Sequence, residues 1–113
     1  MSQQIFIAVL VVAFLSFWWL KRPTITSAAA REAVAAGAHL VDVRSAGEFA
    51  AGHLPGAVNV PVDQLRSRLG ELGEKSVPVV VYCASGARSA MAARTLKANG
   101  FASVRNLGAL SNW

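Results

Sequence analysis

The segment that most constrains the fold is the continuous apolar run at residues 78–82, which reads PVVVY. A strand with one solvated face alternates apolar and polar residues, whereas this run contains no charged residue and only apolar positions up to its tyrosine. Such runs are typical of strands that are buried on both faces, and these occur mainly in parallel sheets covered by helices. The run therefore predicts a strand of an α/β fold.

Helical and strand patterns alternate along the rest of the chain. Helical composition or spacing is found at residues 27–36, 62–72 and 89–98, and short apolar strands are expected at 39–43, 57–60 and 103–107. Ser45 and Glu48 have the spacing of a capping box, which opens a brief helix that Gly52 ends. The alternation predicts an α/β fold with a central parallel sheet flanked by helices. The 113 residues leave room for one such domain.

The first twenty residues are of a different kind. Residues 5–20 read IFIAVLVVAFLSFWWL, which a helix would extend over roughly 24 Å. The uncharged residues 2–4 lengthen the segment to nineteen, enough to cross a bilayer. A buried core helix is disfavoured because the segment has no polar face. We expect residues 1–22 to be a transmembrane helix and N-terminal anchor, followed by a domain over 23–113.

The flanking residues predict an orientation for this anchor. Trp18 and Trp19 lie at the C-terminal end of the apolar run and are followed by Lys21 and Arg22. Indole rings favour the headgroup level and basic residues mark the cytoplasmic side. The pattern predicts a single-pass protein of the inner (cytoplasmic) membrane, with its N-terminus outside and its domain in the cytoplasm. A cleaved signal peptide is the alternative, but its positive charge should precede the apolar run.

Composition excludes several classes of function. The net charge is +5, but the basic residues are scattered, so nucleic-acid binding is not expected. The single cysteine excludes an internal disulfide framework and is compatible with a free thiol in a reducing compartment. The His, Cys and carboxylate residues have no metal-site spacing, and no glycine-rich nucleotide fingerprint is present. We therefore expect neither a metal nor another cofactor.

The chemistry is expected at Cys83, which directly follows the run at 78–82. This order places the sulfur at the carboxyl end of a parallel strand, where α/β folds bind ligands. The N–H groups of the next loop and helix N-terminus would form an anion site that favours the thiolate. Each feature also occurs in ordinary strand-to-helix turns, but together they favour a catalytic cysteine. The residues expected to bind substrate are Ala84, Ser85, Gly86, Ala87, Arg88, whose guanidinium suits an oxyanion, and Ser89.

Four segments resemble the rhodanese-like domain, in its order and at its usual spacing. They are LVDVR at 40–44, Glu48-Phe49, GHLPGAVN at 52–59 and CASGARS at 83–89, within a resemblance that covers residues 24–113. The resemblance implies a single-domain sulfurtransferase with a parallel central sheet. Such enzymes move sulfane sulfur from a small-molecule donor such as thiosulfate to a thiophilic acceptor, cyanide or a thiol, through a persulfide on the loop cysteine. The chain departs from the family at Gly108-Ala109, where a Gly-Gly pair is frequent.

Three further residues are expected to support the loop. Asp42 and Arg44 lie at the end of the strand at 39–43, and we expect them to pair with Glu48 or to brace the loop without taking part in the chemistry. His53 lies within the turn of the GHLPGA segment, so we expect a structural role for it in preference to that of a general base.

Two other functions stay open. A cysteine phosphatase or arsenate reductase also uses a Cys-to-Arg anion loop, but those sites resemble Cys-x5-Arg, one residue longer than Cys83-x4-Arg88. A membrane-tethered persulfide carrier or docking module, which passes sulfur to a protein acceptor without significant small-molecule turnover, would have the same sequence.

Overall fold

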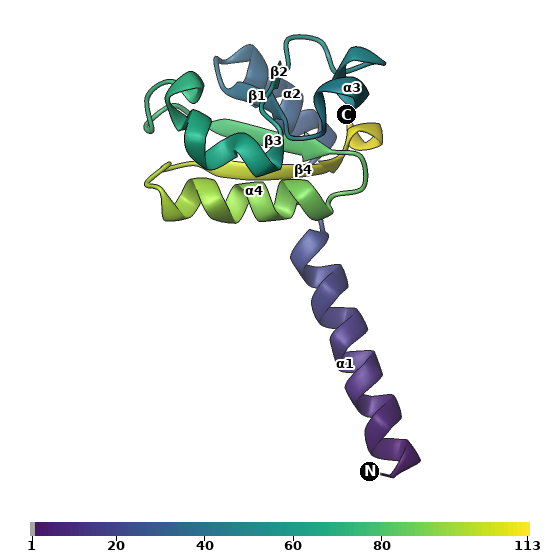
Figure 1. The fold of residues 1–113 in the computed structure, drawn as a ribbon. Helices are drawn as coiled ribbons and strands as arrows, with labels where there is room; N and C mark the ends of the chain where they lie inside the picture. Colours follow the sequence, from purple (N-terminus) through teal and green to yellow (C-terminus); the bar gives the residue numbers. More distant parts are fainter. Residues whose placement is uncertain (1) are drawn as a thin grey trace.

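The protein has an α/β fold in which a four-stranded parallel sheet lies between helices (Figure 1). It is known from a computed structural model that describes residues 2–113, apart from the side chains of residues 20 and 21. All strand pairs are parallel, in the order β2-β1-β3-β4. This confirms the predicted central parallel sheet flanked by helices. The strands are β1 (His39–Asp42), β2 (Val58–Asn59), β3 (Val79–Cys83) and β4 (Val104–Ala109).

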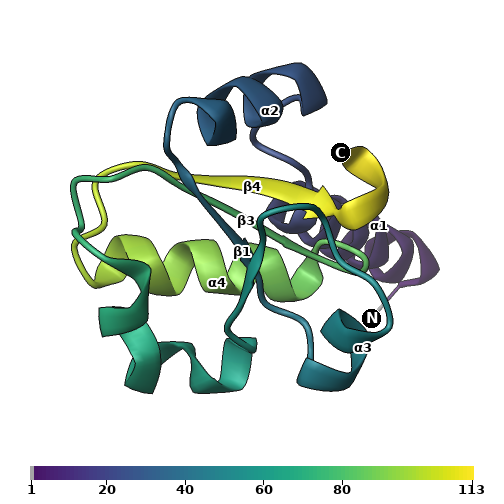
Figure 2. The ribbon, with the colours of Figure 1, turned by 90° about the horizontal axis from the view of Figure 1, so that it is seen from above.

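Helices cover both faces of the sheet. Helix α4 and the 3-10 helix η1 lie on one face, and α2 lies on the other (Figure 2). Between them the sheet is buried on both sides, which is why its central strand can be apolar throughout. The helices are α1 (Gln3–Lys21), α2 (Ser27–Ala35), α3 (Ala46–Ala50), η1 (Val62–Leu72), α4 (Ala87–Ala98) and η2 (Leu110–Asn112).

Strand β3 shows why the apolar run has no alternation. Val79, Val81 and Cys83 pack into the core beneath α4 and η1. Val80 and Tyr82 point to the opposite face and pack into the core beneath α2. All five residues of the strand are buried, as predicted for a doubly covered strand. The alternation also places the Cys83 side chain on the α4 side of the sheet.

Two helices differ in detail from the sequence-based expectation. Helix α4 begins at Ala87, two residues earlier than expected, because Gly86 adopts φ 101° and turns the loop directly into the helix. The segment at 62–72 is helical, but it is a 3-10 helix interrupted at Arg68, whose φ and ψ are −120° and 19°. Its Leu65 and Leu72 are buried, so the apolar spacing still marks the face that packs on the core.

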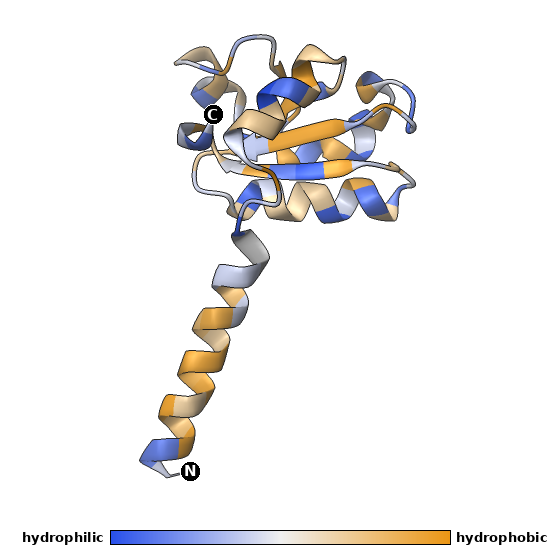
Figure 3. Ribbon diagram, turned by 180° about the vertical axis from the view of Figure 1, so that it is seen from behind, coloured by the Kyte–Doolittle hydropathy of each residue, from blue (hydrophilic) through white to orange (hydrophobic). Residues whose placement is uncertain are grey.

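Helix α1 extends away from the domain and is apolar around its circumference (Figures 1 and 3). Its large apolar side chains between Ile5 and Trp19 are each 50–67 % exposed. Among the described residues, no helix is both long enough and apolar enough to cross a membrane. Residues 5–19 correspond to about 22 Å of helix, against a hydrocarbon core of about 30 Å. The transmembrane anchor predicted over residues 1–22 is therefore not supported.

The orientation predicted for the N-terminus depended on residues that are only partly described. Met1 and the side chain of Lys21 lie outside the described residues. The compartment in which the domain lies therefore stays a prediction from the sequence.

The C-terminal departure from the Gly-Gly pattern has a local explanation. Gly108 adopts φ 86°, and a Cβ atom there would lie 3.0 Å from Asn112 Nδ2 and 3.2 Å from Pro23 Cγ. Ala109 has φ −75° and ψ 147°, which is ordinary extended backbone for any residue. Glycine is therefore required at the first position of the pair, whereas alanine fits the second without strain.

Candidate active site

The Cys83 sulfur lies inside the loop that joins β3 to α4. The backbone N–H of Gly86 donates to Cys83 Sγ at 3.0 Å, and the N–H of Ser89 donates at 3.4 Å. The Ser89 hydroxyl oxygen is also 3.4 Å from the sulfur. Because Gly86 has a left-handed conformation, the backbone can curl around the sulfur over only a few residues. The structure thus brings Gly86 and Ser89 to Cys83, where they form a ring of hydrogen-bond donors around its sulfur atom.

This ring of donors changes the acidity of the thiol. Burial raises the pKa of Cys83, because a thiolate loses hydration inside the protein. Hydrogen bonds from the Ser89 hydroxyl and from the N–H groups of Ser89, Gly86 and Ser85 stabilise the thiolate. These bonds outweigh burial, and the pKa of Cys83 lies below its ordinary value. A thiolate at this position is the chemical condition for a nucleophilic cysteine.

The loop residues differ in exposure in a way that controls access to the sulfur. Cys83 itself is 0 % exposed, and Gly86 is also buried. Ala84, Ser85 and Ala87 are exposed, and their small side chains form the outer surface of the loop. The buried sulfur thus lies behind a rim of small residues.

Arg88 is held by Glu48 from the neighbouring helix α3. Its Nη1 lies 2.6 Å from Glu48 Oε1 and its Nη2 lies 3.0 Å from Oε2, so the pair is bidentate. The hydrogen bonds from Arg88 and from the Ser45 backbone lower the pKa of Glu48 to about 2. Both side chains are 37 % exposed, so the pair lies at the surface of the site. Arg88 thus lies in the first turn of α4 with its guanidinium shared with a carboxylate, and its predicted role in binding substrate stays a prediction.

Asp42 and Arg44 pair with each other beneath the site. Arg44 Nη2 lies 2.7 Å from Asp42 Oδ2, and the same nitrogen donates to the Gly52 carbonyl at 2.6 Å. Asp42 is 0 % exposed and Arg44 is 6 % exposed. The two residues therefore join the end of β1 to the turn that follows α3. Pairing of either residue with Glu48, one of the arrangements expected from the sequence, is not what the geometry shows.

Two residues that the sequence reasoning did not single out also hold this end of the sheet. The Asn59 amide donates to the carbonyls of Asp42 and Arg44, both at 3.0 Å. The Leu54 N–H donates to the Tyr82 hydroxyl at 3.1 Å, and burial raises the pKa of Tyr82 to about 12. Asn59 is the last residue of the GHLPGAVN segment, and its place in that motif is the sequence feature from which its role could have been predicted. Tyr82 carried none, because it reads as one more apolar residue of β3.

His53 contacts the helix that precedes it. Its ring stacks on Phe49 with 3.7 Å between the ring centroids, and its Nδ1 lies 2.9 Å from the Phe49 carbonyl oxygen. These contacts tie the GHLPGA turn to α3 and are consistent with a structural role. Among the residues that the structure describes, no three His, Cys, Asp or Glu side chains are grouped so that they could hold a metal ion.

A pocket of about 320 Å³ adjoins the loop on the α3 side. Its polar lining residues are Arg88, Ser45, and Asp63 and Gln64 of η1. The pocket is polar at these points and apolar at Val43 and Val62. The pocket adjoins Arg88, and neither Cys83 nor residues 84–87 line it.

Comparison with known proteins gives a consistent result. The rhodanese-like domain family matches residues 26–113. The protein YqhL of Bacillus subtilis is 43 % identical over 77 residues, and the chain spans 60 % of its length. The human thiosulfate:glutathione sulfurtransferase is 35 % identical over 106 residues, which cover 80 % of this chain and 92 % of that protein. The human single-domain sulfurtransferase TSTD1 has a solved structure with a TM-score of 0.72 at 32 % identity, covering 81 % of this chain and 95 % of that one. The chain belongs to the rhodanese-like domain family.

Proposed function

We propose that the protein is a sulfurtransferase that moves sulfane sulfur from thiosulfate, or a similar donor, to a thiophilic acceptor through a persulfide on Cys83. The observation that carries the proposal is the ring of donors around the Cys83 sulfur. Gly86 and Ser89 direct their N–H groups at Sγ, and the pKa of the thiol is lowered. A pre-formed thiolate needs no general base, and none of the described residues contacts the sulfur as a base.

The first step forms the persulfide. The Cys83 thiolate attacks the outer sulfur of thiosulfate, a new S–S bond forms, and the bond between the two thiosulfate sulfurs breaks. Sulfite leaves with the electron pair of that bond, and the negative charge on the enzyme moves to the terminal sulfur of the persulfide. The exposed N–H groups at the rim and the helix N-terminus stabilise this anion. Arg88 attracts the sulfonate part of the donor when it exchanges part of its pairing with Glu48.

The second step passes the sulfur on. A thiolate or cyanide attacks the terminal persulfide sulfur, the S–S bond breaks, and Cys83 returns to its thiolate form. The 320 Å³ pocket beside Arg88 has room for the body of a thiol acceptor. A human relative that is named a thiosulfate:glutathione sulfurtransferase supports a thiol as the acceptor class.

The experiment that tests the proposal is intact-protein mass spectrometry before and after incubation with thiosulfate. We expect the mass of one sulfur atom to be added, to be lost again on treatment with cyanide or a thiol, and to be absent in Cys83→Ser. Ser67→Ala is a matched control, because that hydroxyl contacts only the Gln64 carbonyl in η1. Sulfur addition to Cys83→Ser would overturn the proposal.

A second measurement separates an enzyme from a persulfide carrier. Repeated turnover of thiosulfate with cyanide, followed as thiocyanate, is expected of the enzyme. Loading of a single sulfur without turnover would instead favour the carrier, and hydrolysis of an aryl phosphate that depends on Cys83 would favour a phosphatase.

A further inference from the structure

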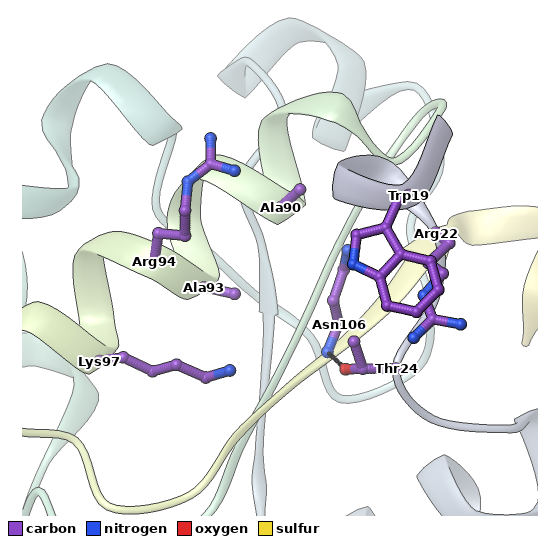
Figure 4. A pocket seen from close by; sticks show the side chains of 8 residues that line it. All are labelled: Trp19, Arg22, Thr24, Ala90, Ala93, Arg94, Lys97 and Asn106. Atoms are coloured by element: carbon purple, nitrogen blue, oxygen red, sulfur yellow. Dashed lines mark hydrogen bonds between the residues drawn. The ribbon is translucent and has the colours of Figure 1, made fainter. Parts of the chain in front are cut away.

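A second pocket lies where the end of α1 meets α4 and β4 (Figure 4). Its volume is about 190 Å³. It does not include Cys83 or any residue of the loop from 84 to 89. The pocket is lined by Trp19, Arg22, Thr24, Asn106 and the α4 residues Ala90, Ala93, Arg94 and Lys97.

The α4 wall of this pocket follows from helical spacing. Ala90, Ala93, Arg94 and Lys97 occupy positions i, i+3, i+4 and i+7, so they form one stripe along the helix. The two alanines are 7 % and 8 % exposed and leave a shallow floor, because their side chains end at Cβ. In Figure 4 the Lys97 side chain extends from this stripe toward Asn106 and Thr24, whereas the Arg94 guanidinium points away from these two residues.

The opposite wall adds a third cation in a fixed position. The Arg22 guanidinium carbon lies 3.5 Å from the centroid of the Trp19 ring, so the two side chains stack at the mouth of the pocket (Figure 4). Stacking on an indole restricts an arginine while leaving its N–H groups free to donate in the plane of the guanidinium. Arg22, Arg94 and Lys97 thus line one cavity, and among the described lining residues there is no Asp or Glu to neutralise them.

The back of the pocket is polar and buried. Asn106 is 3 % exposed; its N–H donates to Thr24 Oγ1 at 2.8 Å, and its Oδ1 accepts from the Gly108 N–H at 2.8 Å. Since the side-chain oxygen is already occupied, the amide NH₂ is the part of Asn106 that remains for a ligand. Arg22, Arg94 and Lys97 are themselves exposed, so the buried Asn106 behind them is the feature that an ordinary solvated face would lack.

From this arrangement we propose that the pocket binds a phosphate-type anion, at a site separate from the sulfur chemistry. Arginine guanidinium groups form bidentate hydrogen bonds to phosphate oxygens, and a lysine supplies a point charge at the same anion. A buried amide donor at the back of the cavity favours a ligand with several acceptor oxygens. The phosphate belongs either to a free small molecule or to a lipid headgroup, because the exposed apolar helix α1 ends at the edge of this pocket.

The test uses the full chain and two probes. The first arm titrates inorganic phosphate and follows the indole N–H resonance of Trp19 by NMR, assigned with Trp19→Phe. The second arm measures co-sedimentation with vesicles of phosphatidylglycerol and of phosphatidylcholine. The test variant is Arg94→Gln with Lys97→Gln. The control is Arg66→Gln with Lys75→Gln, which lowers the net charge by the same amount at exposed positions outside the pocket.

We expect the test variant to weaken phosphate binding at least roughly tenfold, because each lost charge-assisted hydrogen bond contributes on the order of 1.5 kcal/mol. The control variant should bind as the wild type does. If the response appears with inorganic phosphate, the source is a free anion. If it appears only as an excess of binding to phosphatidylglycerol over phosphatidylcholine, the source is a headgroup. No binding in either arm, or an equal loss in the test and control variants, would overturn the proposal.

Discussion

Replacing Ser89 by alanine tests the account of thiol activation most directly. Ser89 is 0 % exposed, and its hydroxyl oxygen lies 3.4 Å from Cys83 Sγ. In the thiol form that hydroxyl donates to the Gly86 carbonyl at 3.1 Å, and in the thiolate form it can turn to the sulfur. The Gly86 carbonyl also accepts from the Ala90 N–H at 3.0 Å, so Ser89→Ala leaves it with a partner. The substitution should therefore act on the thiolate more than on the stability of the fold.

The size of the effect follows from the length of the lost contact. Hydrogen bonds to charged groups contribute about 1.5–3 kcal/mol, and a contact of this length belongs at the low end. A loss of about 1.4 kcal/mol lowers the thiolate fraction roughly tenfold at pH values below the thiol pKa. We expect Ser89→Ala to raise the pKa of Cys83 and to slow alkylation by iodoacetamide by about that factor at low pH.

The pH dependence separates this reasoning from a steric effect. Cys83 is the only cysteine, so the alkylation rate and the thiolate absorbance both report on one group. Above the pKa values of both proteins the thiolate is fully formed, and the rates of wild type and Ser89→Ala should converge. Ser76→Ala is the control, since Ser76 is exposed and lies outside the loop. A rate ratio that stays constant across the whole pH range would refute the role assigned to the Ser89 hydroxyl.

Four further expectations concern the surroundings of the loop and the end of β4. Arg88→Ala should lower kcat/KM for thiosulfate more than it lowers the melting temperature, because the guanidinium is expected to attract the donor; lost stability with unchanged kinetics would contradict this. Glu48→Gln should lower KM for thiosulfate, because it releases Arg88 from a bidentate carboxylate, and a raised KM would show that the pairing is needed to position the arginine. Because the pKa of Glu48 is lowered to about 2, the Glu48 carboxylate stabilises the fold fully above its ordinary pKa, and this stabilisation is lost as the pH falls through about 2. Between pH 5 and 2 the melting temperature of Glu48→Gln should therefore fall less than that of the wild type. Equal falls in melting temperature would refute this. Gly108→Ala should destabilise the protein by about 1 kcal/mol or more in urea melts, because the φ of 86° disfavours alanine and the new Cβ would meet Asn112 and Pro23. Ala109→Gly, which restores the Gly-Gly pair, should give no comparable gain in stability.

The main elements of the fold could be predicted because each has a local signal. The apolar run before Cys83 shows a strand buried on both faces, and the spacing of Ser45 and Glu48 shows a capping box, which the structure confirms with bonds of 3.2 and 3.1 Å. The position of the sulfur at the end of that strand follows from the same pattern. These features depend on neighbours in sequence, so no knowledge of the tertiary structure is needed to find them.

Other features depend on contacts that the sequence does not show. Glu48 and Arg88 are 40 residues apart, and nothing in either segment indicates that the two side chains meet. The bond from Arg44 to the Gly52 carbonyl, which Arg44 makes while it pairs with Asp42, depends on how the end of β1 faces the Gly52 turn. The predicted membrane span was extended by the polar residues 2–4, which add length but no apolar surface.

The capping box connects these two kinds of feature. Glu48 Oε1 accepts from the Ser45 N–H at 3.1 Å and from the Ser45 hydroxyl at 3.0 Å, and the same oxygen accepts from Arg88 Nη1 at 2.6 Å. A helix of five residues has little stability of its own, so its cap does more than begin a helix. The cap holds the Glu48 carboxylate in one position, and this carboxylate in turn holds the Arg88 guanidinium beside the Cys83 loop. If the proposed function holds, a local helix-capping motif thereby determines how much of the Arg88 charge is available to the anionic sulfur donor.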